Sequence, residues 1–212
     1  MRIVCLHANL NNREIVENAL QTVPLERIHK VDEALLSKIQ DNEDEEMIKE
    51  YVEKQLDELM QYQPDAILVT CTNYIVFIEK IQRIFPIPIL QIDEILFEQL
   101  PQTTSVTVLF TNEKTISGTT ARLSRSCPWL QEINIVFIDE VFEWYLRGDL
   151  EAHHQRIVAT LKKLATTEMM IAPQLSMGEV IQLYNEKYQQ QIFSSSEALK
   201  KYFSVFHERF RK

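Results

Sequence analysis

Short apolar runs rich in Ile and Val alternate along this chain with longer amphipathic stretches. Parallel strands covered by helices on both faces are continuous apolar runs, and the helices that connect them are amphipathic. The alternation therefore predicts an α/β fold. The expected strands cover residues 2–7, 27–31, 65–71, 87–92, 105–111, 133–138 and 168–172, of which 27–31 has the weakest pattern.

Between these runs, apolar residues recur at helical spacing. The expected helices cover residues 47–60, 74–84, 150–164 and 199–210. The acidic run 43–46 suits the N-terminus of the first of them, because a helix N-terminus carries partial positive charge. His154 is expected on the buried side of the third. Ser194 and Glu197 predict a capping box at the start of the last.

The chain also repeats itself. Residues 3–9 (IVCLHAN) match residues 106–112 (VTVLFTN), and the same offset places Cys71 on Gln174. Several matches in the same order favour a duplication over chance similarity of composition. We infer two pseudo-symmetric halves, each a parallel sheet flanked by helices, with the ligand cleft between them.

A further match sets the order of the repeat. Residues 31–33 (VDE) pair with residues 138–140 (IDE) at a slightly larger offset, as a loop insertion would produce. Each half then reads strand, helix, strand, helix, strand. The first half is expected to cover residues 1–97 plus 195–212, and the second 98–194.

Polar residues follow the ends of the predicted strands, where α/β proteins of this kind bind ligands. Cys71 ends one strand and precedes a helix, a position that lowers a thiol pKa and favours a nucleophile or a general base. Thr72 and Asn73 add polar groups that could hold a carboxylate there. The alternative is a buried cysteine that serves as a small hydrophobe. His7 is either an acid/base partner at the mouth of the cleft or a histidine hydrogen-bonded to a neighbouring loop.

The segment DAILVTCTN, residues 65–73, resembles the first cysteine motif of the aspartate/glutamate/hydantoin racemase family. Other segments follow in the family's order over nearly the whole chain, including Gly148-Asp149 with His153 after it. The resemblance implies a cofactor-independent enzyme in which two cysteines face opposite sides of the carbon beside a substrate carboxylate. One cysteine removes a proton and the other returns one. Taken with the strand-end positions, the resemblance assigns two catalytic residues, Cys71 and His7. It assigns as substrate-binding Asn9, Thr72, Asn73, Thr111, Thr115, Gln174 and Ser176.

The second half departs from that pattern. Residues 168–177 (EMMIAPQLSM) contain no cysteine where the family's second one is expected, and resemble a branch of the family that lacks it. Three functions stay open. They are a racemase-type isomerase acting on a small amino-acid-like or dicarboxylate substrate, a one-cysteine decarboxylase or cis-trans isomerase, and a carboxylate-binding protein without turnover.

Charge and composition exclude other classes. A net charge of −9 without a basic cluster argues against nucleic acid as a partner. No apolar run approaches the roughly 18 to 20 residues of a membrane span, so no membrane partner is expected. Three widely spaced cysteines predict reduced thiols and a cytoplasmic location. A small carboxylate is the expected partner, and a homodimer is left open.

Nucleotide and metal sites find no support in the sequence. The glycines at 118, 148 and 178 are too far apart for a phosphate-binding loop. His153 and His154 are adjacent, whereas a metal-binding pair on a helix needs a spacing of three or four. Cys5 lies within a strand and Cys127 precedes a proline, so both are expected to be structural. We therefore expect no cofactor and no metal.

Overall fold

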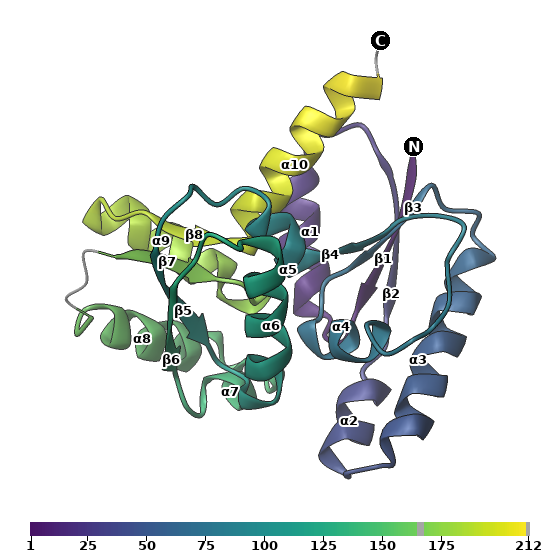
Figure 1. Ribbon diagram of the computed structural model, residues 1–212, viewed down its shortest axis with the longest axis horizontal. Coiled ribbons are helices and arrows are strands. Elements are labelled where there is room, and N and C mark those ends of the chain that lie inside the picture. Colours follow the sequence, from purple (N-terminus) through teal and green to yellow (C-terminus); the bar gives the residue numbers. More distant parts are fainter. Residues whose placement is uncertain (165–167, 211–212) are drawn as a thin grey trace. The chain divides into compact units, whose positions relative to one another are not determined.

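The computed structural model describes residues 1–164 and 168–210, except for the side chains of 206–210. It forms two compact units, Met1–Ile92 with Phe203–Lys212, and Asp93–Tyr202 (Figure 1). Each unit holds a four-stranded parallel sheet flanked by helices, which confirms the predicted fold class. Among the described residues, no helix is both long and apolar enough to cross a bilayer.

The first unit is built around β1 (Arg2–His7), which lies inside its sheet and is buried from Ile3 to His7. The sheet order is β2-β1-β3-β4, with β2 at Glu26–Val31, β3 at Ala66–Val69 and β4 at Ile89–Gln91, and all pairs are parallel. Its helices are α1 (Asn11–Leu20), α2 (Ala34–Gln40), α3 (Glu45–Met60) and α4 (Thr72–Ile78).

The second unit has the same plan around β5 (Ser105–Phe110). The sheet order is β6-β5-β7-β8, with β6 at Glu132–Phe137, β7 at Met169–Ala172 and β8 at Ile192–Ser194, again all parallel. Its helical segments are α5 (Ile92–Phe97), η1 (Glu113–Thr115), α6 (Ile116–Ser126), α7 (Val141–Leu146), α8 (Leu150–Leu161), η2 (Leu175–Met177), α9 (Gly178–Tyr188) and α10 (Ser195–Phe210). Leu109, Ile157 and Ile181 belong to the apolar core between sheet and helices. The α5 and α10 helices each cross the boundary between the units.

The two sheet orders correspond strand for strand, which confirms the duplication. One detail of the sequence match was wrong by one residue. His7 lies opposite Val31 in the first ladder, and Phe110 lies opposite Phe137 in the second. Val31 therefore corresponds to Phe137, not to Ile138, because the backbone register fixes the equivalence, whereas the matching letters VDE and IDE do not.

A matched turn after β1 and β5 supports the same duplication. The Asn9 side-chain oxygen accepts the N–H of Asn11 at 2.9 Å, and the Asn112 side-chain oxygen accepts the N–H of Lys114 at 3.1 Å. Both are turns in which an Asn side chain satisfies the backbone two residues on. The sequence match paired these two asparagines.

The helix that follows Cys71 is shorter than the sequence predicted. The α4 helix ends at Ile78, and Ile84, expected on its buried side, is 96% exposed. Pro86 disfavours helical backbone at the residue before it, and the chain is irregular from Ile81 onward. The prediction of helix through Ile84 was therefore wrong; Pro86 restricts only Phe85, and the structure gives no cause for the end at Ile78.

The buried side of α8 carries His153, Ile157 and Leu161, while His154 is partly exposed. The prediction of a buried His154 was wrong by one residue, which is about 100° of rotation around the helix. Neither ring nitrogen of His153 has a hydrogen-bond partner among the described residues. Burial, followed by the neighbouring His154, lowers the pKa of His153 to about 4, so the ring is neutral near pH 7.

The last helix begins where the predicted capping box places its start. The α10 helix begins at Ser195, and the Glu197 N–H donates to the Ser194 Oγ at 3.4 Å, one half of that box. In its predicted apolar stripe, Leu199 and Phe203 are buried and Tyr202 is partly exposed. The stripe's members at 206 and 210 have side chains outside the described residues.

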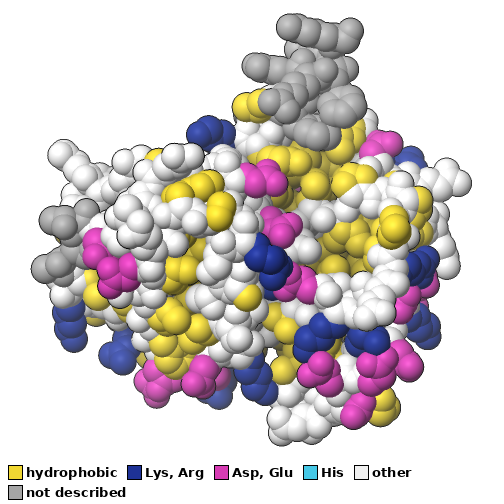
Figure 2. Space-filling model, viewed as in Figure 1, with side chains coloured by type: hydrophobic (Ala, Val, Ile, Leu, Met, Phe, Trp, Pro, Cys, Tyr) yellow, Lys and Arg dark blue, Asp and Glu magenta, His cyan; other side chains and the backbone are white. Residues whose placement is uncertain are grey.

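Basic and acidic side chains are interspersed on the face shown in Figure 2. In the first unit, several basic side chains form ion pairs with acidic side chains. Arg83 lies 2.8 Å from Asp57 and 3.3 Å from Glu53, and Lys80 lies 2.7 Å from Glu45. Because these pairs are exposed, they contribute little to stability.

Candidate functional site

Cys71 lies two residues beyond β3 and is the N-cap of α4. Its backbone is extended (φ −108°, ψ 119°), which turns the chain from the strand into the helix. Thr72 and Asn73 form the first turn of α4 and are buried. Cys5 and Cys127 are buried, while Cys71 is partly exposed. Cys71 is thus the thiol best placed to meet a ligand.

Two opposing influences act on the Cys71 thiol. Burial is the largest and raises its pKa, because the thiolate loses water. The backbone N–H groups of Tyr74 and Asn73 favour the thiolate, and the Asp32 carboxylate disfavours it. The net direction is upward, so the lowered pKa expected from the helix position was wrong. Desolvation and a nearby carboxylate outweigh the short helix, and the resting group is a neutral thiol.

The Asp32 carboxylate belongs to a cluster that sequence reasoning missed. Asp32 follows β2 and accepts the Tyr51 hydroxyl at 2.8 Å from each of its oxygens. The Tyr74 hydroxyl, one turn beyond Cys71, also donates to Asp32. Burial and the Asp32 carboxylate raise the pKa of both tyrosines, which stay protonated. The available signal was that Asp32 directly follows a predicted strand, although that strand had the weakest pattern.

His7 is fully buried at the end of β1, with both ring nitrogens hydrogen-bonded. Nδ1 lies 2.8 Å from Thr70 Oγ1, and Nε2 lies 2.8 Å from His29 Nδ1. The far side of the His29 ring contacts Glu17 Oε1 at 2.6 Å. Burial and then His29 lower the pKa of His7 to about 3, so the ring is neutral near pH 7. The structure therefore favours the second of the two roles expected for His7, a hydrogen-bonded histidine. Its partners are not in a loop: His29 lies on β2, and Thr70 directly follows β3.

The second unit places a different group at the corresponding position. Gln174 lies two residues beyond β7 and is the N-cap of η2, with extended backbone (φ −83°, ψ 126°). Its Oε1 accepts the Thr111 N–H at 2.6 Å and the Thr111 hydroxyl at 3.1 Å. This amide links the ends of β5 and β7. No thiol is near it in the second unit, because the Cys127 sulfur lies at the end of α6, 3.6 Å from the Phe97 carbonyl oxygen.

The remaining candidates have mainly local partners. The Thr115 hydroxyl donates to the Asn112 carbonyl at 2.8 Å and is fully buried. Ser176 is buried within η2. Asn9 holds the turn described above. The structure thus brings together Cys71 with Thr72 and Asn73 in the first unit, and Thr111 with Gln174 in the second.

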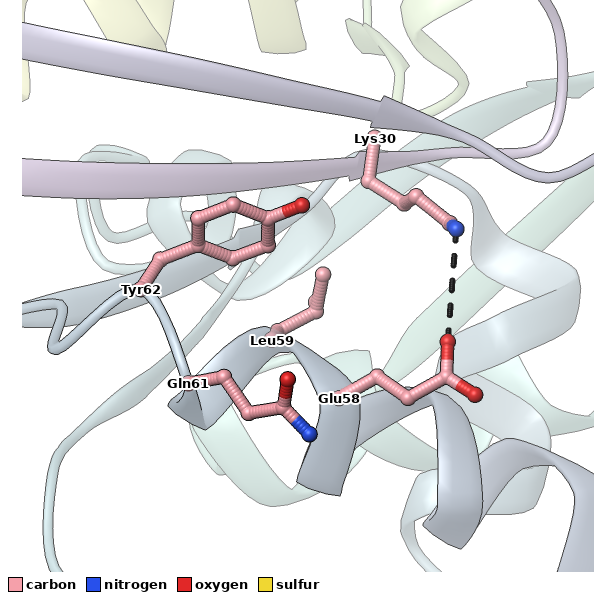
Figure 3. Close-up of a pocket in the computed structure, with 5 residues that line it drawn as sticks. All are labelled: Lys30, Glu58, Leu59, Gln61 and Tyr62. Atoms are coloured by element: carbon pink, nitrogen blue, oxygen red, sulfur yellow. Dashed lines mark ion pairs between the residues drawn. The ribbon is translucent and has the colours of Figure 1, made fainter.

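A pocket of about 330 Å³ lies elsewhere in the first unit, beside the end of α3 (Figure 3). It is lined by Lys30, Glu58, Leu59, Gln61 and Tyr62. Figure 3 shows the Lys30 amino group turned toward the Glu58 carboxylate, and the two are 4.0 Å apart. The two charged side chains of the pocket therefore compensate each other. The pocket contains none of the residues that the sequence assigned to a site. We place the candidate site at the strand ends instead.

Comparison with solved structures identifies the fold. No protein-family model matches the sequence, and no curated protein sequence is similar to it. Glutamate racemase RacE1 from Bacillus anthracis is similar over 98% of this chain and 82% of its own, with a TM-score of 0.73 at 15% identity. The aspartate racemase of Picrophilus torridus covers 97% and 93%, with a TM-score of 0.73 at 13% identity. The allantoin racemase of Pseudomonas fluorescens covers 99% and 92%, with a TM-score of 0.65 at 14% identity. The chain has the two-unit α/β fold of the aspartate, glutamate and allantoin racemases.

Proposed function

We propose that this protein is a cofactor-independent, racemase-type enzyme that uses Cys71 as an acid/base beside the carboxylate of a small amino-acid-like or dicarboxylate substrate. The observation that carries the proposal is the setting of Cys71 on a racemase fold. It is a partly exposed thiol at the junction of β3 and α4, and the N–H groups of Asn73 and Tyr74 face its sulfur. These groups can stabilise negative charge on sulfur while a proton is away.

The raised pKa of Cys71 defines its role in the resting site. A neutral thiol acts first as an acid when the substrate loses CO2, giving its proton to the enolate that the broken C–C bond leaves; for hydrogen exchange it first loses its proton to solvent, and the thiolate then removes the α-proton. As a base it requires the thiolate, which the N–H groups of the first α4 turn favour. In this proposal the Thr72 hydroxyl and the Asn73 amide bind the carboxylate. A correctly positioned acid/base contributes about 10²- to 10⁴-fold to the rate.

The second unit argues for chemistry on one face of the substrate. An amide neither takes nor gives a proton near neutral pH, and the Gln174 oxygen already accepts two hydrogen bonds from Thr111. This observation favours a second candidate function, in which the protein binds a carboxylate without turnover. A one-cysteine decarboxylase or cis-trans isomerase would also satisfy it. We assign His7 no proton transfer in the reaction, because both of its ring nitrogens are hydrogen-bonded within the protein.

Hydrogen exchange in D2O separates these functions. The protein is incubated with amino acids, hydroxy acids and substituted malonates, and deuterium incorporation, configuration and CO2 release are measured. One-face chemistry predicts incorporation with retained configuration, or decarboxylation, and its loss in Cys71→Ala. Cys127→Ala removes a buried thiol elsewhere and should keep the activity.

Two results would contradict the enzymatic proposal. Turnover that persists undiminished in Cys71→Ala would remove Cys71 from the mechanism. A compound that raises the melting temperature, as a ligand selective for the folded state must, but shows neither exchange nor decarboxylation would establish a binding protein.

A further inference from the structure

Three potential metal ligands meet on one face of the first sheet. Cys5 and His7 are two residues apart on β1, so their side chains project to the same face. His29 lies directly opposite Cys5 in the β1–β2 ladder. One donor atom from each of the three lies within 4.8 Å of the others. The sequence prediction of no metal site considered the spacing of the cysteines and that of His153 and His154, and no sequence motif links Cys5 to His29.

The hydrogen bonds around the two rings leave both inner nitrogens facing each other. Thr70 Oγ1 lies 3.1 Å from the Leu6 carbonyl, to which it can donate, so it can accept the Nδ1–H of His7. Glu17 can accept the Nε2–H of His29. With the protons on these outer nitrogens, His7 Nε2 and His29 Nδ1 present two lone pairs 2.8 Å apart. A cation, either a proton or a metal, can lie between them; without one, the His7 Nε2–H donates to His29 Nδ1 and the Thr70 hydroxyl donates to His7 Nδ1.

We propose that Cys5, His7 and His29 form a binding site for one Zn²⁺ ion, with Glu17 orienting the His29 ring from behind. Thiolate and imidazole are the ligand types that zinc prefers in proteins, and three protein ligands leave a fourth position open to water. A carboxylate that accepts the outer N–H of a ligating histidine is the usual second partner at such sites. This inference is independent of the proposed function, because none of the three proposed ligands takes a step in the proposed reaction.

Binding requires a small adjustment of the rings. Tetrahedral coordination with Zn–N bonds of about 2.0 to 2.1 Å separates the two nitrogens by roughly 3.3 Å, so the rings must move apart from 2.8 Å. His29 is on β2, an edge strand, and can shift more readily than His7. Glu17 is partly exposed and marks the side from which an ion could enter.

The charges around the proposed ion only partly balance it. A divalent cation with a Cys5 thiolate leaves one net positive charge, which the Glu17 carboxylate offsets, so the buried site need not carry a large net charge. Three other groups must be counted. Arg27 Nε already pairs with Glu17 at 3.1 Å, Arg13 lies close enough to His7 to lower its pKa, and Thr70 is neutral. The two arginines oppose cation binding.

Proton release gives the site a pH dependence. Zn²⁺ displaces the proton of the Cys5 thiol, and the proton leaves to solvent. Affinity should therefore rise with pH, by roughly tenfold per pH unit for each proton released.

Co²⁺ is the direct probe, because a thiolate ligand gives it an intense charge-transfer band and four-coordination gives it visible bands. The full chain is stripped of metal with a chelator and titrated with Co²⁺ and then with Zn²⁺. We expect one Co²⁺ per chain with a thiolate band, displaced by one equivalent of Zn²⁺. Absence of uptake, or uptake without a thiolate band, would overturn the proposal.

Matched variants locate the ion. Cys5→Ser should remove the thiolate band, and Cys127→Ser and Cys71→Ser should keep it. Because Cys5 is fully buried, His29→Gln on the edge strand is the second variant, with an expected loss of more than about 100-fold in affinity. Glu17→Gln should weaken binding about 10- to 100-fold, whereas Arg27→Gln should not weaken it. A band that survives in folded Cys5→Ser, or disappears in Cys71→Ser, would place the ion elsewhere.

Discussion

The ends of β3 and β7 have nearly the same backbone and opposite chemistry. Cys71 and Gln174 each lie two residues beyond their strand, in extended conformation, at the N-cap of the next helical segment. Cys71 keeps a partly exposed thiol, while the Gln174 amide is buried against Thr111. The duplication has thus preserved where a side chain is presented and changed what that side chain can do. The expected cleft between the halves, with both positions facing it, stays a prediction.

Gln174→Cys is the largest test of this comparison. If the two positions face one substrate, a second thiol restores proton donation on the opposite face, and racemisation should appear in place of exchange with retention. We expect a gain on the order of 100-fold over the background rate of inversion, below the full range for an acid/base, because a 1 Å misplacement costs about as much. Chiral chromatography of the product measures it, with Gln174→Ser as control.

A folded Gln174→Cys variant that reacts with thiol reagents but inverts no substrate of the parent protein would count against a shared substrate. Gln174→Ser should invert nothing, because a hydroxyl is a far weaker acid than a thiol.

The two units also differ in how they hold a buried histidine. His7 has two ring partners, whereas His153 has none among the described residues. Replacing an unsatisfied polar ring with an apolar side chain removes its desolvation cost, so His153→Leu should raise the free energy of unfolding by about 1 to 3 kcal/mol. Urea denaturation at pH 7 measures this.

The same substitution should change the acid limb of the stability profile. Both histidines have folded-state pKa values below the unfolded value of about 6.5, so the folded state resists protonation. Above pH 6.5 neither histidine lowers the free energy of unfolding by taking up a proton. As the pH falls, that free energy decreases, down to about pH 4 for His153 and about pH 3 for His7. His153→Leu should lessen the loss between pH 6.5 and 4. An unchanged acid limb would show that His153 is not buried in solution.

Replacing Gln174 and Cys71 with alanine should lower the free energy of unfolding by unequal amounts. Gln174→Ala leaves the buried Thr111 N–H and hydroxyl without their acceptor, at about 1 to 3 kcal/mol. Cys71→Ala removes a partly exposed thiol whose backbone partners can bind water, so its cost should be below about 1 kcal/mol. Paired denaturation curves test this, and equal costs would mean that the Gln174 hydrogen bonds add nothing to stability.

The smallest effects are expected at the matched turns. Asn9→Ala and Asn112→Ala each remove one side-chain hydrogen bond to the backbone, and each should cost about 1 kcal/mol. Equal losses would support equivalent roles. A difference of more than about 1 kcal/mol would show that the two turns have diverged in energy as the strand ends have in chemistry.

The sequence predicted the architecture better than the site. β1 was predicted to the residue because five of its six residues are buried, which produces an unbroken apolar run. β8 was missed, since three residues (Ile192–Ser194) are too few for any periodic pattern. The duplication was visible because the loops of the two halves differ little in length.

At the site, the position of Cys71 could be predicted and its protonation could not. The helix N-terminus is a local feature of the sequence, whereas desolvation and the Asp32 carboxylate come from residues distant in the chain. The same limit applies to the pairing of Cys5 with His29, which depends on strand register. When strand pairing brings two distant residues into contact, the spacing of residues along either strand gives no sign of it.

The single thiol at the candidate site has a consequence for oxidative damage. A sulfenic acid on a cysteine is normally rescued when a second thiol condenses with it to form a disulfide. Cys5 and Cys127 are buried at other places in the fold, and Gln174 offers no sulfur. Repair of oxidised Cys71 would therefore depend on a small thiol from solution. Its raised pKa offsets this exposure, because a protonated sulfur reacts slowly with peroxide.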